Sequence, residues 1–148
     1  MLKCLILLLC WGITIPTHAF PCFITLIKDN CWTNYNVVVN VSDPSTEKEL
    51  LAITVPKGKS WVRQGFTCQP KQALSLVASF TPVFWKDDAG KTYRDHRNWA
   101  LPEEISRGDT AWNINVCYPA DFSSVPLPPD AGSDCKCKLD DIPPIKPQ

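Results

Sequence analysis

Histidine and methionine are scarce in this 148-residue chain, which has two histidines and one methionine. It also has no net charge, because fifteen basic residues balance fifteen acidic ones. A balanced charge exerts no long-range attraction on phosphate backbones or anionic membranes, which argues against a nucleic-acid-binding role. The sequence also lacks a Gly-x-Ser-x-Gly elbow, a phosphate-binding loop, the spacing of a calcium hand and any internal repeat. These absences remove the most recognisable classes of hydrolase, nucleotide-binding protein and calcium sensor.

The shortage of histidine also limits catalysis and metal binding. After residue 19 the only histidine is His96, in a polar run that is typical of the wetter face of a hairpin strand. A zinc site usually needs three or four nitrogen or sulfur ligands, and a general base needs a partner nucleophile. Cys135 and Cys137 could bind a soft metal, but disulfides are favoured in an oxidising compartment. We therefore predict a non-enzymatic protein with no cofactor and no metal site.

No apolar run is long enough to span a bilayer, which takes roughly 20 residues. The longest, from Cys4 to Ile15, follows Lys3 and precedes Pro16 and the small residue Ala19. This order is typical of a secretory signal peptide, so we predict a signal over 1–19 that is cleaved after Ala19. We expect no transmembrane segment after cleavage and a periplasmic or secreted mature protein.

Cleavage leaves an even number of cysteines, which in a small exported domain is typical of three disulfides. The six are Cys22, Cys31, Cys68, Cys117, Cys135 and Cys137. Six cysteines allow fifteen pairings, and a strained Cys135–Cys137 bridge would account for three of them, so 15 − 3 = 12 remain open. In every one of the twelve, the C-terminal segment is linked twice to the body of the protein.

Alternation of apolar and polar residues with a period of two dominates the chain after residue 33. It recurs in 34–42, 51–55, 74–81 and 112–118, where Asn113 and Asn115 face away from the apolar side. Such alternation is typical of strands with one buried face. With shorter strands in 60–67, 84–85 and 91–99, it predicts an all-β, disulfide-stapled β-sandwich of about seven strands over 20–118, in preference to a partly closed barrel.

Turn residues separate these runs. Residues 56–59 are expected to close a hairpin between 51–55 and 60–67, and residues 87–90 a second hairpin between 84–85 and 91–99. The one helical signal is a short turn at 102–107, where a proline precedes two glutamates.

Proline is concentrated after residue 118, where seven of the fourteen prolines lie. Proline fixes an extended backbone and removes a hydrogen-bond donor, so 119–148 is predicted to be an irregular, Pro-rich C-terminal arm. The disulfides of Cys135 and Cys137 would fix its middle. The arm either covers a sheet edge or docks another protein, and the sequence leaves both interpretations open.

Tryptophan is plentiful for a chain of this size. Trp112 fits the buried side of its strand, whereas Trp61 is followed by Arg63, and Trp85 and Trp99 lie near predicted hairpin ends. Exposed aromatic side chains on β-structures stack on sugars or anchor protein partners, so these three are our candidate binding residues, although simple packing in the core is the alternative.

Our preferred hypothesis is a non-enzymatic exported binding or structural module of a bacterial-type envelope or secretome. It would engage another protein through a β face rich in asparagine and aromatic residues and through the Pro-rich tail, as part of an envelope or secretion assembly. The layout resembles small exported β-sandwich modules, a likeness of fold alone. The alternatives are a secreted carbohydrate-binding module that uses the exposed tryptophans, and a disulfide-rich inhibitor; an enzyme based on His96 is disfavoured.

Overall fold

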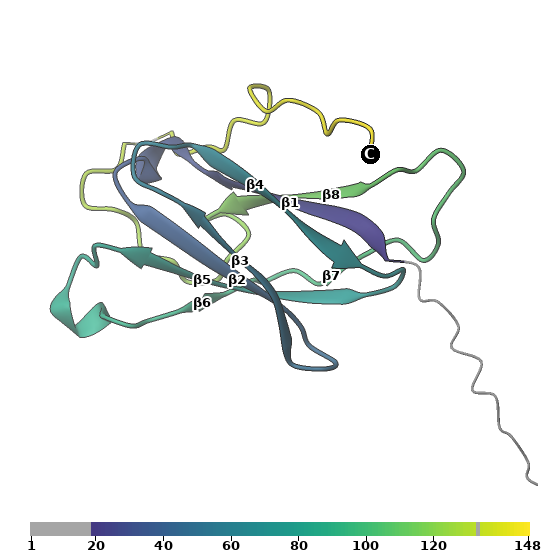
Figure 1. Ribbon diagram of the computed structural model, residues 1–148. Helices are drawn as coiled ribbons and strands as arrows, with labels where there is room; N and C mark the ends of the chain where they lie inside the picture. Colours follow the sequence, from purple (N-terminus) through teal and green to yellow (C-terminus); the bar gives the residue numbers. More distant parts are fainter. Residues whose placement is uncertain (1–18, 133) are drawn as a thin grey trace, which may run out of the picture.

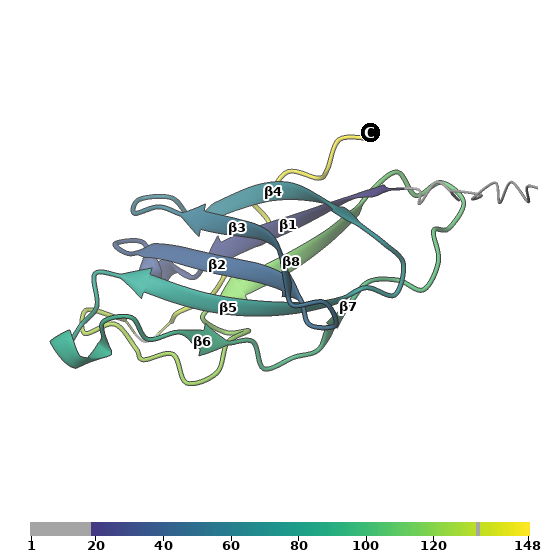
Figure 2. The same ribbon diagram turned by 60° about the horizontal axis from the view of Figure 1, so that its bottom comes forward.

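The computed structural model describes residues 19–132 and 134–148, so all of the predicted signal peptide except Ala19 lies outside the described residues. The described residues contain eight strands and two single-turn 3-10 helices. The strands form two sheets that pack face to face, which confirms the predicted β-sandwich (Figure 1, Figure 2). The elements in chain order are β1 (Phe20–Lys28), η1 (Asn30–Trp32), β2 (Asn36–Asp43), β3 (Lys48–Val55), β4 (Trp61–Cys68), β5 (Ala73–Thr81), η2 (Lys86–Asp88), β6 (Tyr93–Arg94), β7 (Trp99–Ala100) and β8 (Trp112–Tyr118).

The smaller sheet has the strand order β4-β1-β8. Its central strand β1 is antiparallel to β4 and parallel to β8, so the first and last strands of the fold are neighbours (Figure 1). The larger sheet has the order β3-β2-β5-β6, with β7 also paired to β5, and all its pairings are antiparallel.

Strand β1 is absent from the strands predicted above, and its burial explains why. Ile24 and Leu26 face the core between the sheets, whereas Thr25 and Ile27 face outward. Both outward residues are nevertheless fully buried, because other parts of the chain cover them. A strand that is covered on both faces has no polar side, so it loses the alternation by which half-exposed strands are recognised.

The core consists of the inward residues of both sheets, as the alternation predicts for β2, β3, β5 and β8. Trp32, on η1, is its largest fully buried side chain. Its ring centroid lies 4.7 Å from that of Phe80 and 4.8 Å from that of Tyr118, both in edge-on geometry. Edge-on packing of this kind adds to the stabilisation that comes from burial alone.

Both predicted hairpins are wrong. The turn after β3 carries the chain from the larger sheet to β4 in the smaller one, where β4 pairs with β1 and not with β3. The Gly58 N–H ties this turn to the loop after η1 by donating to the Thr33 carbonyl at 2.8 Å. Residues 82–92 form a loop that contains η2. Phe84 is not in a strand; its ring packs against Trp32 and Phe80 in the core. Residues 102–107 contain no helix.

Candidate functional site

Three disulfides cross-link the described residues. Cys22–Cys68 joins β1 to β4 within the smaller sheet. Cys31–Cys135 and Cys117–Cys137 join the C-terminal arm, 119–148, to η1 and to the end of β8. The predicted double attachment of the arm is therefore confirmed, and three disulfides fit an extracellular or otherwise oxidising compartment.

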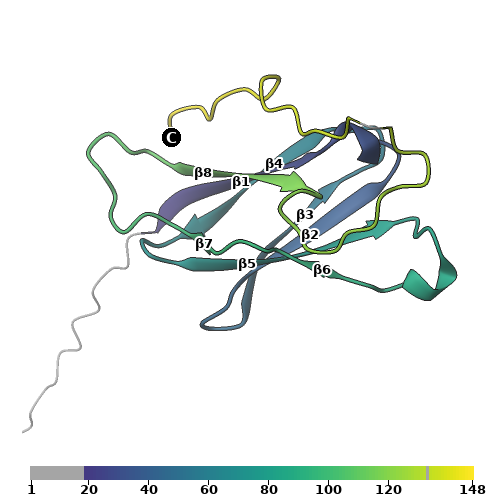
Figure 3. The same ribbon diagram turned by 180° about the vertical axis from the view of Figure 1, so that it is seen from behind.

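The first part of the arm extends the larger sheet. Phe122 forms an isolated antiparallel bridge with Asp95, and the Ser123 N–H donates to the Arg94 carbonyl at 2.8 Å. The arm thus lies along the far side of β6 before it turns toward the smaller sheet (Figure 3). This part does cover a sheet edge, as one of the two interpretations of the arm requires.

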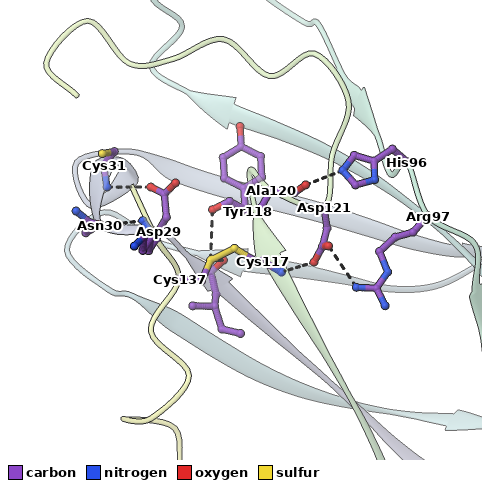
Figure 4. Close-up of a disulfide and its surroundings, with 12 residues drawn as sticks. Asp29, Asn30, Cys31, His96, Arg97, Cys117, Tyr118, Ala120, Asp121 and Cys137 are labelled. Atoms are coloured by element: carbon purple, nitrogen blue, oxygen red, sulfur yellow. Dashed lines mark hydrogen bonds and ion pairs between the residues drawn. A yellow bond between two sulfur atoms is a disulfide. The ribbon is translucent and has the colours of Figure 1, made fainter. Parts of the chain in front are cut away.

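His96 lies beside the first part of the arm, and its side chain contacts the backbone of the arm. Its Nε2 lies 2.6 Å from the Ala120 carbonyl, and the neighbouring Arg97 guanidinium lies 3.4 Å from the Asp121 carboxylate (Figure 4). Both contacts fix the beginning of the arm to the segment after β6.

The later part of the arm lies on the outer side of the smaller sheet (Figure 1, Figure 3). The Lys136 N–H donates to Asn30 Oδ1 at 2.8 Å, and the Asn30 N–H donates back to the Lys136 carbonyl at 3.4 Å. Cys137 Sγ lies 3.6 Å from the Ile27 carbonyl oxygen. In an extended Cys-Lys-Cys-Lys run, the lysines point away from the cysteines, and the Lys136 and Lys138 side chains are accordingly exposed.

A chain of hydrogen bonds crosses the outer face of the smaller sheet. Arg63 Nε donates to Thr25 Oγ1 at 2.8 Å, and Thr25 Oγ1 donates to Asn113 Oδ1 at the same distance. Asn113 Nδ2 then donates to Asn115 Oδ1 at 2.7 Å. We call these four residues the polar row. The asparagines lie on the exposed side of β8, as predicted. Thr25 and Arg63 were missed because β1, which carries Thr25 and lies between β4 and β8, was not recognised as a strand.

Beside the polar row the strand register places Trp61, Ile27 and Cys117 in line across the sheet. The Cys117–Cys137 disulfide brings the arm over this line. Between the sheet and the arm lies a cavity of about 250 Å³, which we call the Trp61 cavity. Its lining comprises Ile27, Lys28, Asp29, Asn30, Thr33, Ser60, Trp61, Lys136, Lys138 and Asp141. The alternation of cysteine and lysine in 135–138 is the sequence signal that could have indicated the two arm lysines.

Lys28 lines the cavity from the sheet side and is only 2% exposed. Its Nζ donates to the carbonyl oxygens of Tyr35 at 2.7 Å and Pro56 at 2.9 Å, and lies 3.5 Å from that of Thr33. Burial lowers the pKa of the Lys28 amine to about 8, because the charged form loses hydration. Lys28 therefore joins the loop after η1 to the turn before β4.

Asp29, the next residue, caps η1. Its Oδ1 accepts the Cys31 N–H at 2.9 Å, and burial raises the pKa of the carboxyl group although this bond opposes the shift. The carboxylate lies within 4.8 Å of the sulfur atoms of Cys31 and Cys135. Those sulfurs are bonded to each other, so neither has the thiolate that binds a metal.

The three candidate tryptophans lie in different environments. Trp61 is half-buried, lines the cavity, and has the Arg63 guanidinium 5.7 Å from its ring centroid. Trp85 is 67% exposed beside η2. Trp99 is only 7% exposed and packs in the core, with the Arg97 guanidinium 4.0 Å from its ring centroid. The structure therefore brings Trp61 alone of the three to the cavity, and Trp99 does not offer the exposed ring that stacking requires.

No family model matches the chain, and no curated protein or solved structure is detectably similar to it. Across 19–132 and 134–148, no helix combines the length and apolar character needed to cross a membrane.

Proposed function

We propose that this chain is a non-enzymatic exported binding module that acts in the periplasm or outside the cell and engages another protein. The binding surface consists of the outer face of the smaller sheet and the later part of the arm. One observation carries the proposal: two disulfides and the Asn30–Lys136 hydrogen bonds fix the arm over the sheet with a cavity between them. A terminal segment that served only to cover a sheet edge would pack down on it.

Rigidity supports a binding role. A surface whose parts are already held in place loses little conformational entropy when a partner arrives, so more of the contact energy appears as affinity. The polar row adds hydrogen-bonding groups that are already aligned across three strands. Trp61 provides the aromatic side chain that is common at the energetic centres of protein interfaces.

The arrangement around His96 supports the absence of catalysis. Its imidazole Nε2 is engaged by the Ala120 carbonyl, and among the described residues its side chain is bonded to no serine, threonine or cysteine that it could activate. The Trp61 cavity lies on the smaller sheet, whereas His96 follows β6 of the larger one.

Site-specific photo-crosslinking in cells of the protein's own host tests the proposal. A photoreactive residue at Asn113, on the outer face of the smaller sheet, is expected to capture a discrete protein, and the added change Trp61→Ala should abolish the capture. The matched control places the same residue at Thr54, an exposed position on β3 of the larger sheet. Equal capture from both positions, or none from Asn113, would refute the proposed surface.

A second candidate function is favoured by one observation, the 67% exposure of Trp85. An exposed indole ring is suited to stacking on a sugar, as in a carbohydrate-binding module. A glycan array probed with the mature protein and with Trp85→Ala tests this function. Loss of a defined glycan signal in the variant would support it, and an array without signal would eliminate it.

A further inference from the structure

We propose that the Trp61 cavity receives an acidic side chain, a glutamate or aspartate, from the protein partner. This inference rests on the proposed binding function and specifies the chemistry that the partner must present. Three observations carry it: the charges around the cavity, its size, and the mixture of apolar and cationic groups in its wall.

Cationic groups outnumber carboxylates here, although the chain as a whole is balanced. The cavity is lined by Lys28, Lys136 and Lys138, and a shallow hollow that shares Trp61 with it adds Lys59 and Arg63. Against these five cations stand only two carboxylates, those of Asp29 and Asp141. The Asp29 carboxylate is buried and accepts the Cys31 N–H, and even when its charge is counted in full the cations outnumber the carboxylates by five to two. The local field therefore favours an incoming anion.

The size of the cavity indicates one side chain rather than a whole small molecule. Its volume of about 250 Å³ falls below the roughly 300–1,000 Å³ typical of small-molecule sites. Pockets that accept a single anchoring side chain are common at the centres of protein interfaces.

The wall suits the two parts of an acidic side chain. The half-buried Trp61 provides apolar surface for the methylene groups, while the exposed Lys136 and Lys138 line the cavity from the arm and supply cationic charge for the carboxylate. The hydrogen-bonding capacity of Lys28 is used by the Tyr35 and Pro56 carbonyls, so Lys28 contributes charge while the two arm lysines donate. One face of the Trp61 ring is occupied by the Arg63 guanidinium, which leaves a poor platform for a stacked sugar.

The chain also places a carboxylate of its own at this cavity. Asp141 is exposed and lines the wall together with Lys136 and Lys138. It competes with a partner carboxylate for the same ammonium groups. Removal of its charge should therefore strengthen binding, the opposite of the effect expected at the lysines.

Fluorescence polarisation with defined peptides tests the inference on the folded, oxidised mature protein. The probe is a labelled octapeptide that alternates glutamate with valine, and its neutral counterpart has glutamine in place of glutamate. We expect binding of the acidic peptide only. The double variant Lys136→Glu/Lys138→Glu should weaken it at least about tenfold, the effect of losing charge-assisted contacts. Asp141→Asn should strengthen it about two- to fivefold, as expected when one exposed like charge is removed beside the incoming carboxylate.

The matched control is Lys48→Glu/Lys86→Glu, which makes the same change in net charge at exposed positions on β3 and η2. Unchanged affinity in this control, with loss in the arm variant, supports the site. Equal loss in both variants, equal binding of the two peptides, or no binding of the acidic peptide up to about 1 mM would overturn the inference. A heparin-derived oligosaccharide is the third probe, and its binding at the arm lysines without peptide binding would overturn it in favour of a sulfated glycan.

The photo-crosslinking experiment separates this inference from the proposed function. If Lys136→Glu/Lys138→Glu leaves the capture at Asn113 intact while Trp61→Ala abolishes it, the binding surface stands and the acidic side chain is refuted. If neither variant changes the capture, both proposals fail.

Discussion

The Asp121 carboxylate accepts the Cys117 N–H at 2.8 Å, and the Asp121 N–H donates to the Cys117 carbonyl at 2.9 Å. Cys117 thus has both peptide groups satisfied by one residue at the point where β8 ends. Since β8 pairs with β1 on one side only, this capped position closes one end of an otherwise open sheet edge. The same carboxylate lies 3.4 Å from the Arg97 guanidinium.

Replacement of this carboxylate should destabilise the fold. Asp121→Ala leaves the Cys117 N–H without its acceptor, so the free energy of unfolding should fall by about 1–3 kcal/mol. Urea unfolding followed by tryptophan fluorescence measures the loss. Asp87→Ala, on the exposed side of η2, is the control and should change stability by no more than about 0.5 kcal/mol. An equal loss in both variants would contradict the capping role.

The Tyr118 hydroxyl offers the opposite prediction. It is buried in the core and has no hydrogen-bond partner among the described residues, and burial raises the pKa of the phenol. An unpaired buried hydroxyl is unfavourable, so Tyr118→Phe should increase the free energy of unfolding by about 1 kcal/mol. The control is Tyr35→Phe, which removes a hydroxyl bonded to Asp130 at 3.2 Å and should give no gain. Thermal unfolding of both variants decides the matter, and destabilisation by Tyr118→Phe would disprove the prediction.

Lys28 should make stability depend on pH. Its pKa is about 8 in the folded protein and 10.5 ordinarily, so between these values the unfolded chain binds more protons. The contribution of Lys28 to stability therefore rises with pH from about 8 to 10.5. The unfolding free energy of the wild type minus that of Lys28→Met should therefore increase between pH 7 and pH 9.5. Lys59→Met, at an exposed position, should show no such growth, and a difference that stays flat for Lys28→Met would rule out the effect.

The two disulfides of the arm should differ in the stability they provide. Cys31–Cys135 spans 104 residues and Cys117–Cys137 spans 20. The entropy of loop closure gives about 5 kcal/mol for the first and about 3 kcal/mol for the second. Paired serine variants, unfolded in guanidinium without reductant, should lose stability in that order. The reverse order would show that native contacts of the arm outweigh chain entropy.

Signal cleavage should leave Phe20 as the first residue. Ala19 is exposed, whereas Phe20 begins β1 and its ring centroid lies 4.6 Å from that of Trp112. Expression of the full chain in an exporting cell, followed by intact mass measurement, should give the mass of residues 20–148 less six hydrogen atoms, two for each of the three disulfides. Ala19→Arg should retain the leader because signal peptidase requires a small residue there. A different first residue would refute the assigned cleavage position.

The sequence predicts those parts of the fold in which one side of a strand faces water. The alternation from Tyr35 to Ser42 and from Trp112 to Tyr118 identifies β2 and β8 closely, since polar residues mark their outer faces. It fails for β1 because Thr25 and Ile27 are covered by other segments. Local turn residues at 56–59 indicate a reversal of the chain correctly, but they carry no information on which sheet the next strand joins.

The candidate site was predictable only in part. Trp61 and the asparagines of β8 follow from residue type and alternation. The cavity does not, because it depends on the pairing of Cys117 with Cys137, which occurs in only three of the twelve arrangements that sequence spacing left open. Lys136 and Lys138 acquire their position from that pairing and from the contact with Asn30.

The pairing of β1 with β8 sets the order in which the protein can assemble. Strand β1 is the first to be synthesised, yet its two neighbours in the sheet are β4 and β8. Strand β8 ends 90 residues after β1 does (118 − 28). The antiparallel ladders of β2, β3 and β5 join strands that are closer in sequence and close earlier. The opening strand, which carries Cys22, therefore stays without its full set of neighbours until nearly the whole polypeptide is available.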